Sequence, residues 1–534
     1  MPYIIKIIYI LSFYLATNFN MWYNFFIKIF KGFIMDYKKL QNGSDIRGVA
    51  LEGIEGQNVN LTKEATFDIA RGFALWLMEK TGKKNLRVAV GRDSRLSGEN
   101  LCNWLCTALI KQGINVTDFG MASTPAMFMA CVTEGYKFDG AVMITASHLP
   151  FNRNGFKFFT ENGGLEKEDI KAILSYAEQS MQTELPIGTL TYADFMGAYS
   201  QLLVDKIKTA TDSELPLKGF KIVVDAGNGA GGFFVDKVLK PLGADTTGSR
   251  YLEPDGSFPN HIPNPEDKDA MKSIIEAVKE NDADFGIIFD TDVDRAGAVL
   301  SDGSELNRNR IIAMLSAILL REHPGTTIVT DSITSTGLNE FIKAKGGIHH
   351  RFKRGYKNVI NESIRLNNRK QDSQLAIETS GHGALKENYF LDDGAYLVTK
   401  LLIELANSKA QGYTLESIIA DLKEPKESVE FRMNILLDDF KEYGLKVIND
   451  LTEYACEQEG WDIEPSNYEG IRVNLNKEHG NGWFLLRMSL HDPLLPLNVE
   501  SDDEGGAKII ASELAKFIKN YDKLDAGKLF DFVK

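Results

Sequence analysis

The chain has 534 residues, of which 43% are hydrophobic and 25% charged, and its formal net charge is −14. A single hydrophobic core seldom grows past about 250–300 residues, so we expect three or four domains. The acidic balance argues against a nucleic-acid partner, because phosphate backbones select basic surfaces. The four cysteines include no Cys-x-x-Cys pair, which argues against a disulfide framework or a zinc cluster and favours the reducing cytoplasm.

The first 35 residues differ from the rest of the chain. Residues 7–27 carry no charge and are long enough to span a bilayer. They lack a small-residue cleavage site, and Met35 begins the stretch MDYKKLQNGSDIRG, which is typical of a natural start. We favour a misassigned start over a membrane anchor or a core helix, so membrane contact is expected only if this extension is real.

Three later stretches share one pattern: LRVAVGRDSRLSGENL from Leu86, FKIVVDAGNGAGGFFV from Phe220 and TTIVTDSITSTGLNEF from Thr326. Each is an apolar run, a polar turn and a helical pattern, which is typical of an α/β unit. Further apolar runs that predict strands lie at residues 141–144, 285–289 and 374–377. We therefore expect consecutive α/β domains with mixed sheets, at residues 36–195, 196–307 and 308–425.

The pattern changes in residues 426–534. The stretches EFRMNI, GIRVNL and GWFLLRMSL alternate apolar and polar side chains, as half-buried antiparallel strands do, and EGGAKIIASELAKFIKNY predicts a closing helix. This part is expected to form a smaller α+β domain. Because loops at the carboxyl ends of strands gather where ligands bind, we expect the domains to surround a central cleft.

The strongest motif is FGIIFDTDVDRAG, in which a strand delivers Asp290, Asp292 and Asp294 at alternate positions. Crowded carboxylates repel one another unless a cation compensates them, and Mg²⁺ prefers such oxygen ligands. A solvated acidic turn is the alternative. An EF-hand is disfavoured, because Arg295 stands at the sixth position and Ser301 at the twelfth.

A second motif is AVMITASHLPFNRNGFKFF, where Ser147 and His148 follow an apolar strand. A serine that carries a phosphoryl group needs a divalent cation to offset the charge and a base to handle the substrate proton. We place Lys157 on an Asn-Gly turn that folds back toward the serine. The alternative is an ordinary strand-end turn with a buried hydroxyl.

Further loops offer groups that suit a sugar phosphate. IETSGHGAL places Glu378 and Ser380 where they suit neighbouring sugar hydroxyls, and His382 where it could contact a phosphate or shuttle a proton. RMSLHDP offers an anion three side chains, Arg487, Ser489 and His491. GSDIRG sets Arg47 between glycines. Each of these loops, taken alone, is equally compatible with a structural turn.

Taken in order, these loops resemble the α-D-phosphohexomutase superfamily, the phosphoglucomutases and phosphomannomutases, from about residue 41 to the C-terminus. TASHLPFNRNGFK is similar to its TASHNP phosphoserine loop, DTDVDR to its DGDGDR metal loop, ETSGH to its ExSGH sugar loop and RMSLHDP to its RPSGTEP phosphate loop. One such motif is weak evidence, whereas four in the family's order are strong.

The resemblance implies a role for each matching residue. Ser147 would bear the phosphoryl group, and an oxygen of that group would join the three aspartates around Mg²⁺. Lys157 would match the candidate general base, and Arg47 and Arg295 the arginines near the transferring phosphate. The candidate sugar or phosphate contacts are Glu378, Ser380, Arg487, Ser489, His491 and Lys357, with His148 and His382 as further catalytic candidates.

The chain also departs from the family pattern. Thr291 and Val293 replace two glycines of the metal loop. KRGYKN resembles the VGHK turn, but Tyr356 stands where the histidine would be, which leaves Lys157 or His382 to carry that proton. In the phosphate loop, proline, glycine and threonine are replaced by Met488, Leu490 and His491.

These features predict a cytoplasmic phosphohexomutase, an intramolecular phosphotransferase that uses Mg²⁺, hexose phosphates and hexose 1,6-bisphosphate. Glucose and mannose phosphates are the expected substrates. The alternatives are a haloacid-dehalogenase-type sugar phosphatase with Asp290 as nucleophile, since IIFDTDVD also fits that pattern, and a non-catalytic sugar-phosphate-binding relative.

Overall fold

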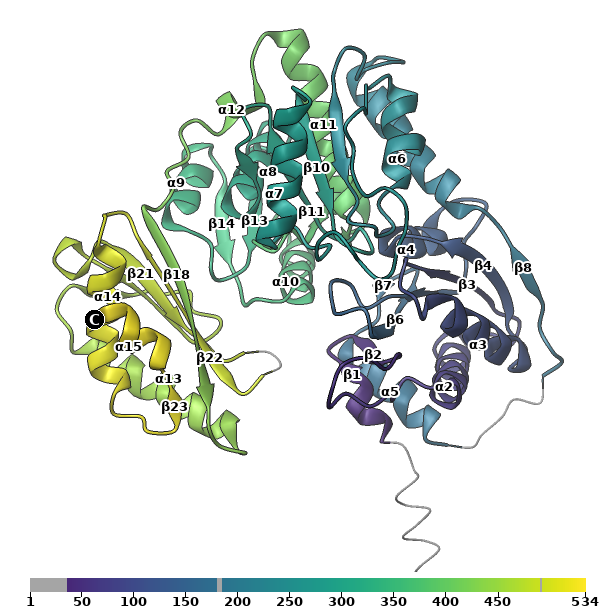
Figure 1. Ribbon diagram of the computed structural model, residues 1–534, viewed down its shortest axis with the longest axis horizontal. Helices are drawn as coiled ribbons and strands as arrows, with labels where there is room; N and C mark the ends of the chain where they lie inside the picture. Colours follow the sequence, from purple (N-terminus) through teal and green to yellow (C-terminus); the bar gives the residue numbers. More distant parts are fainter. Residues whose placement is uncertain (1–35, 180–184, 490–491) are drawn as a thin grey trace, which may run out of the picture.

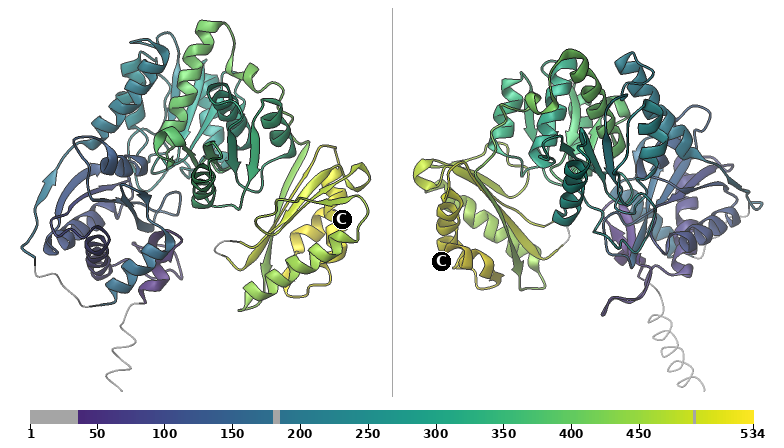
Figure 2. Two further views of the ribbon diagram at one scale, coloured as in Figure 1. Left: turned by 180° about the vertical axis from the view of Figure 1, so that it is seen from behind. Right: turned by 45° about the horizontal axis from the view of Figure 1, so that its top comes forward.

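The computed structural model describes residues 36–179, 185–489 and 492–534. The described parts follow one another along an arc, with the N-terminal part at one end and the C-terminal part at the other (Figures 1 and 2). Within these ranges, no helix has the length and apolar character needed to cross a bilayer. The predicted hydrophobic extension, residues 1–35, lies outside the described residues.

The N-terminal part is a mixed sheet covered by helices. Its strands are β1 (Gln41–Asn42), β2 (Asp45–Val49), β3 (Arg87–Arg92), β4 (Asn115–Met121), β5 (Gly140–Ile144), β6 (Arg153–Thr160), β7 (Gly163–Gly164) and β8 (Leu190–Tyr192). Its helices are η1 (Tyr37–Leu40), α2 (Lys63–Thr81), α3 (Gly98–Lys111), α4 (Thr124–Val132) and α5 (Lys167–Ala177). The strand order is β1-β2-β6-β5-β3-β4-β8, with β3 parallel to β4 and β5, and β6 antiparallel to β5. Every residue of β5 is buried, as expected for a strand covered on both faces.

The second part repeats the strand–turn–helix pattern around a smaller mixed sheet. Its strands are β9 (Ile222–Asp225), β10 (Phe285–Phe289), β11 (Ala296–Leu300) and β12 (Glu305–Leu306). Its helices are α6 (Phe195–Thr211), η2 (Val235–Leu239), η3 (Lys240–Leu242) and α7 (Lys268–Glu280). β9 and β10 are parallel, and β10 and β11 form an antiparallel pair whose connection carries the aspartates. The sequence predicted a helix after β9, but only a short π turn, η2, and a short 3₁₀ turn, η3, form there.

The third part has the same architecture. Its strands are β13 (Thr327–Thr330), β14 (Ile348–Arg351), β15 (Ser373–Ile377), β16 (Gly383–Leu385) and β17 (Leu391–Asp392). Its helices are α8 (Arg308–Glu322), α9 (Thr336–Ala344), α10 (Tyr356–Asn368), η4 (Lys386–Asn388), α11 (Gly394–Gln411) and α12 (Leu415–Ile418). β13 is parallel to β14 and β15, and β15 is antiparallel to β16.

The C-terminal part is an antiparallel sheet packed against helices. Its strands are β18 (Glu427–Ile435), β19 (Trp461–Ile463), β20 (Ile471–Leu475), β21 (Gly482–Leu486), β22 (Leu494–Ser501) and β23 (Leu524–Asp525). Its helices are α13 (Phe440–Cys456), η5 (Lys477–His479), α14 (Gly506–Ile518) and α15 (Gly527–Val533). The predicted closing helix is α14, but α15 follows it and packs against it.

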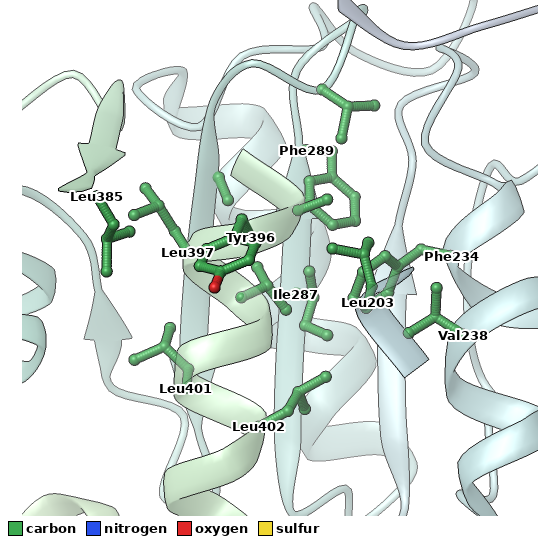
Figure 3. Packing of buried hydrophobic residues seen from close by; sticks show 14 of the residues in the cluster. Leu203, Phe234, Val238, Ile287, Phe289, Leu385, Tyr396, Leu397, Leu401 and Leu402 are labelled. Carbon is green, nitrogen blue, oxygen red and sulfur yellow. The ribbon is translucent and has the colours of Figure 1, made fainter. Parts of the chain in front are cut away.

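The hydrophobic core explains how these parts hold one another. One cluster runs from the N-terminal part through the second and third parts; in Figure 3, Leu203 of α6, Phe289 of β10 and Leu397 of α11 belong to it. The C-terminal part has a core of its own, from Phe431 to Leu529. The predicted fold class is confirmed, and the domain boundaries stay predictions.

Candidate active site

The three aspartates lie in the connection between β10 and β11. One carboxylate oxygen of each lies within 4.8 Å of the others, and all three side chains are buried. Val293, between them, has a φ of 67°, a left-handed conformation that disfavours β-branched residues. The turn that gathers the three carboxylates therefore contains a strained residue.

Two buried cations offset the charge of the aspartates. The Lys157 Nζ lies 3.0 Å from Asp292 Oδ2 and 2.5 Å from Asp294 Oδ2. The Arg295 guanidinium donates to Asp290 Oδ2 at 2.9 Å. Burial acts to lower the pKa of Lys157, but Asp292 and Asp294 outweigh it and hold the pKa well above its usual value. The lysine is therefore positively charged in this arrangement.

Lys157 reaches this position from a strand rather than from a turn. The structure places it in β6, opposite Met143 of β5, and the Asn154-Gly155 pair that was expected to turn is part of the same strand. The chain reverses earlier, at residues 148–152. Because β6 pairs antiparallel with β5, it carries the lysine past the serine loop.

Ser147 lies beside the aspartates, at the end of β5. Its Oγ donates to Asp290 Oδ2 at 3.1 Å and accepts from Arg295 at 2.9 Å. The φ of Ser147 is 52°, a left-handed conformation that costs about 1–2 kcal/mol for a residue other than glycine. His148 Nδ1 lies 3.3 Å from the same oxygen and 2.7 Å from Arg295. Burial removes the His148 imidazole from water, and the positive charges of Arg295 and Arg47 disfavour a second proton on the ring. The pKa of His148 is therefore lowered.

A buried arginine that the sequence analysis did not select holds the serine loop in place. Arg95 donates to the carbonyls of Ser147 and Leu149, and to those of Pro150 and Arg153 at 2.9 and 3.0 Å. Its position directly after β3, in the stretch GRDSR, was the available signal. The carbonyls of a strained loop thus converge on one guanidinium, which fixes the backbone that carries the hydroxyl.

The residues present fit a hard divalent cation. Asp292 Oδ1 and Asp294 Oδ1 are buried and have no hydrogen-bond partner among the described residues. Burial and the neighbouring charge of Asp294 raise the pKa of Asp290 well above its usual value. Unpaired carboxylate oxygens in a buried cluster are the groups that Mg²⁺ accepts as ligands.

The predicted sugar loop follows β15. Glu378 Oε1 accepts from the backbone N–H of Gly355 at 2.6 Å, and Ser380 Oγ lies 3.4 Å from Glu378 Oε2. His382 Nδ1 lies 2.6 Å from Asp392 Oδ2. Burial opposes the charge on His382, but Asp392 and Asp294 raise its pKa to about 9. Tyr356 stacks on His382 with ring centroids 5.0 Å apart.

A cleft lies beside these groups. Its walls include seven of the predicted site residues, namely His148, Arg295, Glu378, Ser380, His382, Arg487 and Ser489. Arg47 lies close by on β2, where it donates to Asp45 at 2.8 Å. His491 lies outside the described residues.

Lys357, a further candidate, lies in the first turn of α10. Its Nζ donates to the carbonyl of Gly164 and to Glu166 Oε1 at 3.1 Å. It lines a cavity between β7 and α10 whose walls also include Lys157, Asp294 and Tyr356, and it is absent from the walls of the main cleft. The substrate contact of Lys357 stays a prediction.

Comparison with known proteins agrees with this architecture. Family models of phosphoglucomutase/phosphomannomutase α/β/α domains I, II and III match residues 38–184, 198–303 and 307–425. A phosphoglucomutase of Neisseria gonorrhoeae is 32% identical over 473 residues, 88% of this chain and 95% of its own length. The chain belongs to the phosphoglucomutase/phosphomannomutase family.

Other members of this phosphohexomutase family are similarly close. A phosphomannomutase/phosphoglucomutase of Pseudomonas aeruginosa is 31% identical over 464 residues, covering 86% of this chain and 92% of that protein. The crystal structure of a phosphoglucomutase/phosphomannomutase family protein from Burkholderia thailandensis has a TM-score of 0.75 and 26% identity, covering 91% of this chain and 99% of that one. The resemblance predicted from four short motifs is confirmed.

Proposed function

We propose that this phosphohexomutase interconverts hexose 1-phosphates and hexose 6-phosphates, of glucose, mannose or both, through a phosphoserine at Ser147 and a bisphosphorylated sugar. One observation carries the proposal: the Ser147 hydroxyl lies between Asp290 and Arg295, at 3.1 and 2.9 Å. A hydroxyl between a carboxylate cluster and a guanidinium is placed to exchange a phosphoryl group.

The reaction is a pair of phosphoryl transfers. The phosphorus–oxygen bond to Ser147 Oγ breaks as a sugar hydroxyl oxygen bonds to phosphorus, and the hydroxyl proton leaves to a base. The sugar then carries two phosphates. After it turns over in the cleft, its other phosphate returns to Ser147 Oγ and a proton returns to the oxygen that it leaves. No group is lost, so the net reaction moves one phosphate.

Cations of the chain stabilise the transferring group. Arg295 donates to Ser147 Oγ, and the single positive charge of Lys157 lies between two of the aspartates. A Mg²⁺ held by the three aspartates and an oxygen of the phosphoserine would supply further charge neutralisation. Charge that is placed before the reaction needs no reorganisation during it.

Proton transfer falls to groups on the cleft wall. His148 is neutral because its pKa is lowered, but the same lowering makes it a weak base for the hydroxyl proton. Lys157 and His382 are positively charged in this arrangement, so each can donate a proton. Lys157 acts as a general base only after it releases its own proton, which rearrangement around a bound cation and phosphate would have to drive.

The test is a coupled mutase assay with Mg²⁺ and a trace of glucose 1,6-bisphosphate, across the 1-phosphates of glucose, mannose, glucosamine and N-acetylglucosamine. We expect turnover of glucose or mannose 1-phosphate, and loss of at least about 10⁴-fold in Ser147→Ala. Acid-stable phosphate on a peptide containing Ser147 supports the mutase. Acid-labile phosphate on Asp290 would support the phosphatase instead, and absence of any turnover would support the non-catalytic binder.

A further inference from the structure

Arg354 lines the cleft where the third part meets the C-terminal part. Its backbone N–H donates to Glu469 Oε1 at 2.9 Å, across that junction. The next residue, Gly355, has a φ of 112° and donates its N–H to Glu378. The backbone of Arg354 is thus fixed on both sides, beside the carboxylate predicted to bind the sugar.

The guanidinium of Arg354 has no hydrogen bond within the described part of the chain. Its nearest carboxylates are Glu266 and Asp331, at 3.8 and 3.9 Å, beyond hydrogen-bonding distance. Its side chain is 22% exposed, so the donors reach the cleft. Arg295, by contrast, is buried and bonded to Asp290, Asn264 and Ser147. The guanidinium of Arg295 is therefore hydrogen-bonded to protein groups, whereas the donors of Arg354 are available to a ligand.

Arg487 faces the same space from the C-terminal part. Arg487 is buried, and its Nε has no hydrogen-bond partner among the described residues. Its guanidinium donates to the Met488 carbonyl at 3.3 Å. Burial lowers the pKa of Arg487; the charge of Glu469 acts to raise it, and the positive charge of Arg354 acts to lower it. Two guanidinium groups within electrostatic reach, neither hydrogen-bonded to a carboxylate, form a pocket for an anion.

We propose that Arg354 binds, together with Arg487, the phosphate group that is not being transferred. This inference rests on the proposed function, because it assigns one end of the same substrate. The sequence supplies a reason: the family's VGHK turn has a valine where this chain has Arg354, and the phosphate loop has lost its glycine to Leu490. A leucine side chain hinders the close approach to the backbone that glycine allows, and a planar guanidinium supplies side-chain donors for the same anion.

A structural role is the competing explanation. Burial acts to lower the pKa of Arg354, but the charges of Asp331, Glu378 and Glu266 raise it, so the arginine also balances those acids. A purely structural arginine would affect unfolding and leave the Michaelis constant unchanged. A phosphate-binding arginine would affect the Michaelis constant with substrates that carry a phosphate.

The variants are Arg354→Met, which keeps the apolar stem, and Arg354→Lys, which keeps the charge but not the fork. The matched control is Arg310→Met: Arg310 is 25% exposed, lies in the same part of the chain, and is paired with Glu424 at 2.9 Å outside the cleft. Kinetics are measured with glucose 1-phosphate. Binding of glucose 1-phosphate is measured by calorimetry in a Ser147→Ala background, with and without Arg354→Met.

For Arg354→Met we expect the Michaelis constant and the dissociation constant to rise about 10- to 100-fold, or about 1.4–2.7 kcal/mol, with kcat within about threefold. Arg354→Lys should recover part of the loss, and Arg310→Met none of the effect. Constants within twofold of the wild type would overturn the inference while the mutase proposal stands. If the wild type turns over no hexose phosphate but binding still depends on Arg354, the mutase proposal fails and the anion site stands.

Discussion

The two sides of the cleft are built differently. On the side of the aspartates, Ser147, Asp290 and Arg295 are each at most 4% exposed and bond to one another. That side lies on the core shared by three parts of the chain. On the other side, Arg487 comes from a part with its own core, and side chains such as Asp492 are largely exposed.

The difference separates two tasks. Charges on the aspartate side are largely offset by Lys157 and Arg295 before any ligand arrives, which suits bond making and breaking. Among the described residues, no hydrogen bond joins the guanidinium of Arg354 or Arg487 to a carboxylate, which suits a phosphate that must be held, released and exchanged for another. A part with its own core can also shift as a unit while the chemical side keeps its geometry.

The largest expected effect comes from removing a charge on the aspartate side. Lys157→Met leaves Asp292 and Asp294 without their shared cation, and breaking a buried pair costs about 3–5 kcal/mol. We expect the free energy of unfolding to fall by that amount, measured in urea without Mg²⁺, and mutase activity to fall at least about 10²-fold.

A double variant separates charge from packing. Adding Asp292→Asn to Lys157→Met removes one of the two uncompensated carboxylates, so part of the lost stability should return. If Lys157→Met unfolds like the wild type, the aspartate side does not depend on the buried charge of Lys157.

Metal binding gives the next largest effect. Chelation should abolish turnover reversibly, and Mg²⁺ at 100 times its dissociation constant should stabilise the fold by about 2.7 kcal/mol. Thermal unfolding with and without MgCl₂ measures this, and Asp294→Asn serves as the comparison because its Oδ1 is one of the unpaired buried oxygens. If Mg²⁺ leaves the melting temperature of the wild type unchanged, the three aspartates do not form a metal site.

Much of the aspartate side could be predicted from the sequence. Alternation along an apolar strand placed Asp290, Asp292 and Asp294 together, and a strand followed by Thr-Ala-Ser-His indicated the serine loop. These signals are local, because a strand end and the loop after it fix where their side chains point. The three-part α/β fold was readable for the same reason, from repeated strand–turn–helix stretches.

Contacts between distant segments could not be predicted in this way. Arg95 donates to carbonyls more than 50 residues away, and the stretch GRDSR carries no signal that identifies the serine loop as the partner of Arg95. Lys357 lies in the first turn of α10, which begins at Tyr356, and the rotation of that turn decides which cavity its side chain enters. The Asn154-Gly155 pair was expected to turn, but pairing with β2 and β5 holds it in β6.

A smaller effect is expected from loosening the serine loop. Arg95→Met removes the donors to the Ser147 and Leu149 carbonyls, so the hydroxyl loses its fixed position. A displacement of about 1 Å costs up to about 10²-fold, so we expect kcat to fall 10- to 100-fold with little change in the Michaelis constant. Arg87→Met is the control, because Arg87 lies on β3, the strand that precedes Arg95, and donates to the Tyr136 carbonyl instead. A change confined to the Michaelis constant would argue against the clamp.

The smallest expected effect tests whether the metal loop stores strain. Val293 is fully buried at a φ of 67°, where the family's loop has glycine. Val293→Ala loses buried surface and keeps the left-handed penalty of about 1–2 kcal/mol, whereas Val293→Gly loses slightly more surface but escapes that penalty. We therefore expect the glycine variant to be at least as stable as the alanine variant in urea unfolding, although glycine is usually the less stable of the two by about 0.5–1 kcal/mol. The usual order would mean that the loop relaxes, and that the aspartate side is less rigid than its contacts imply.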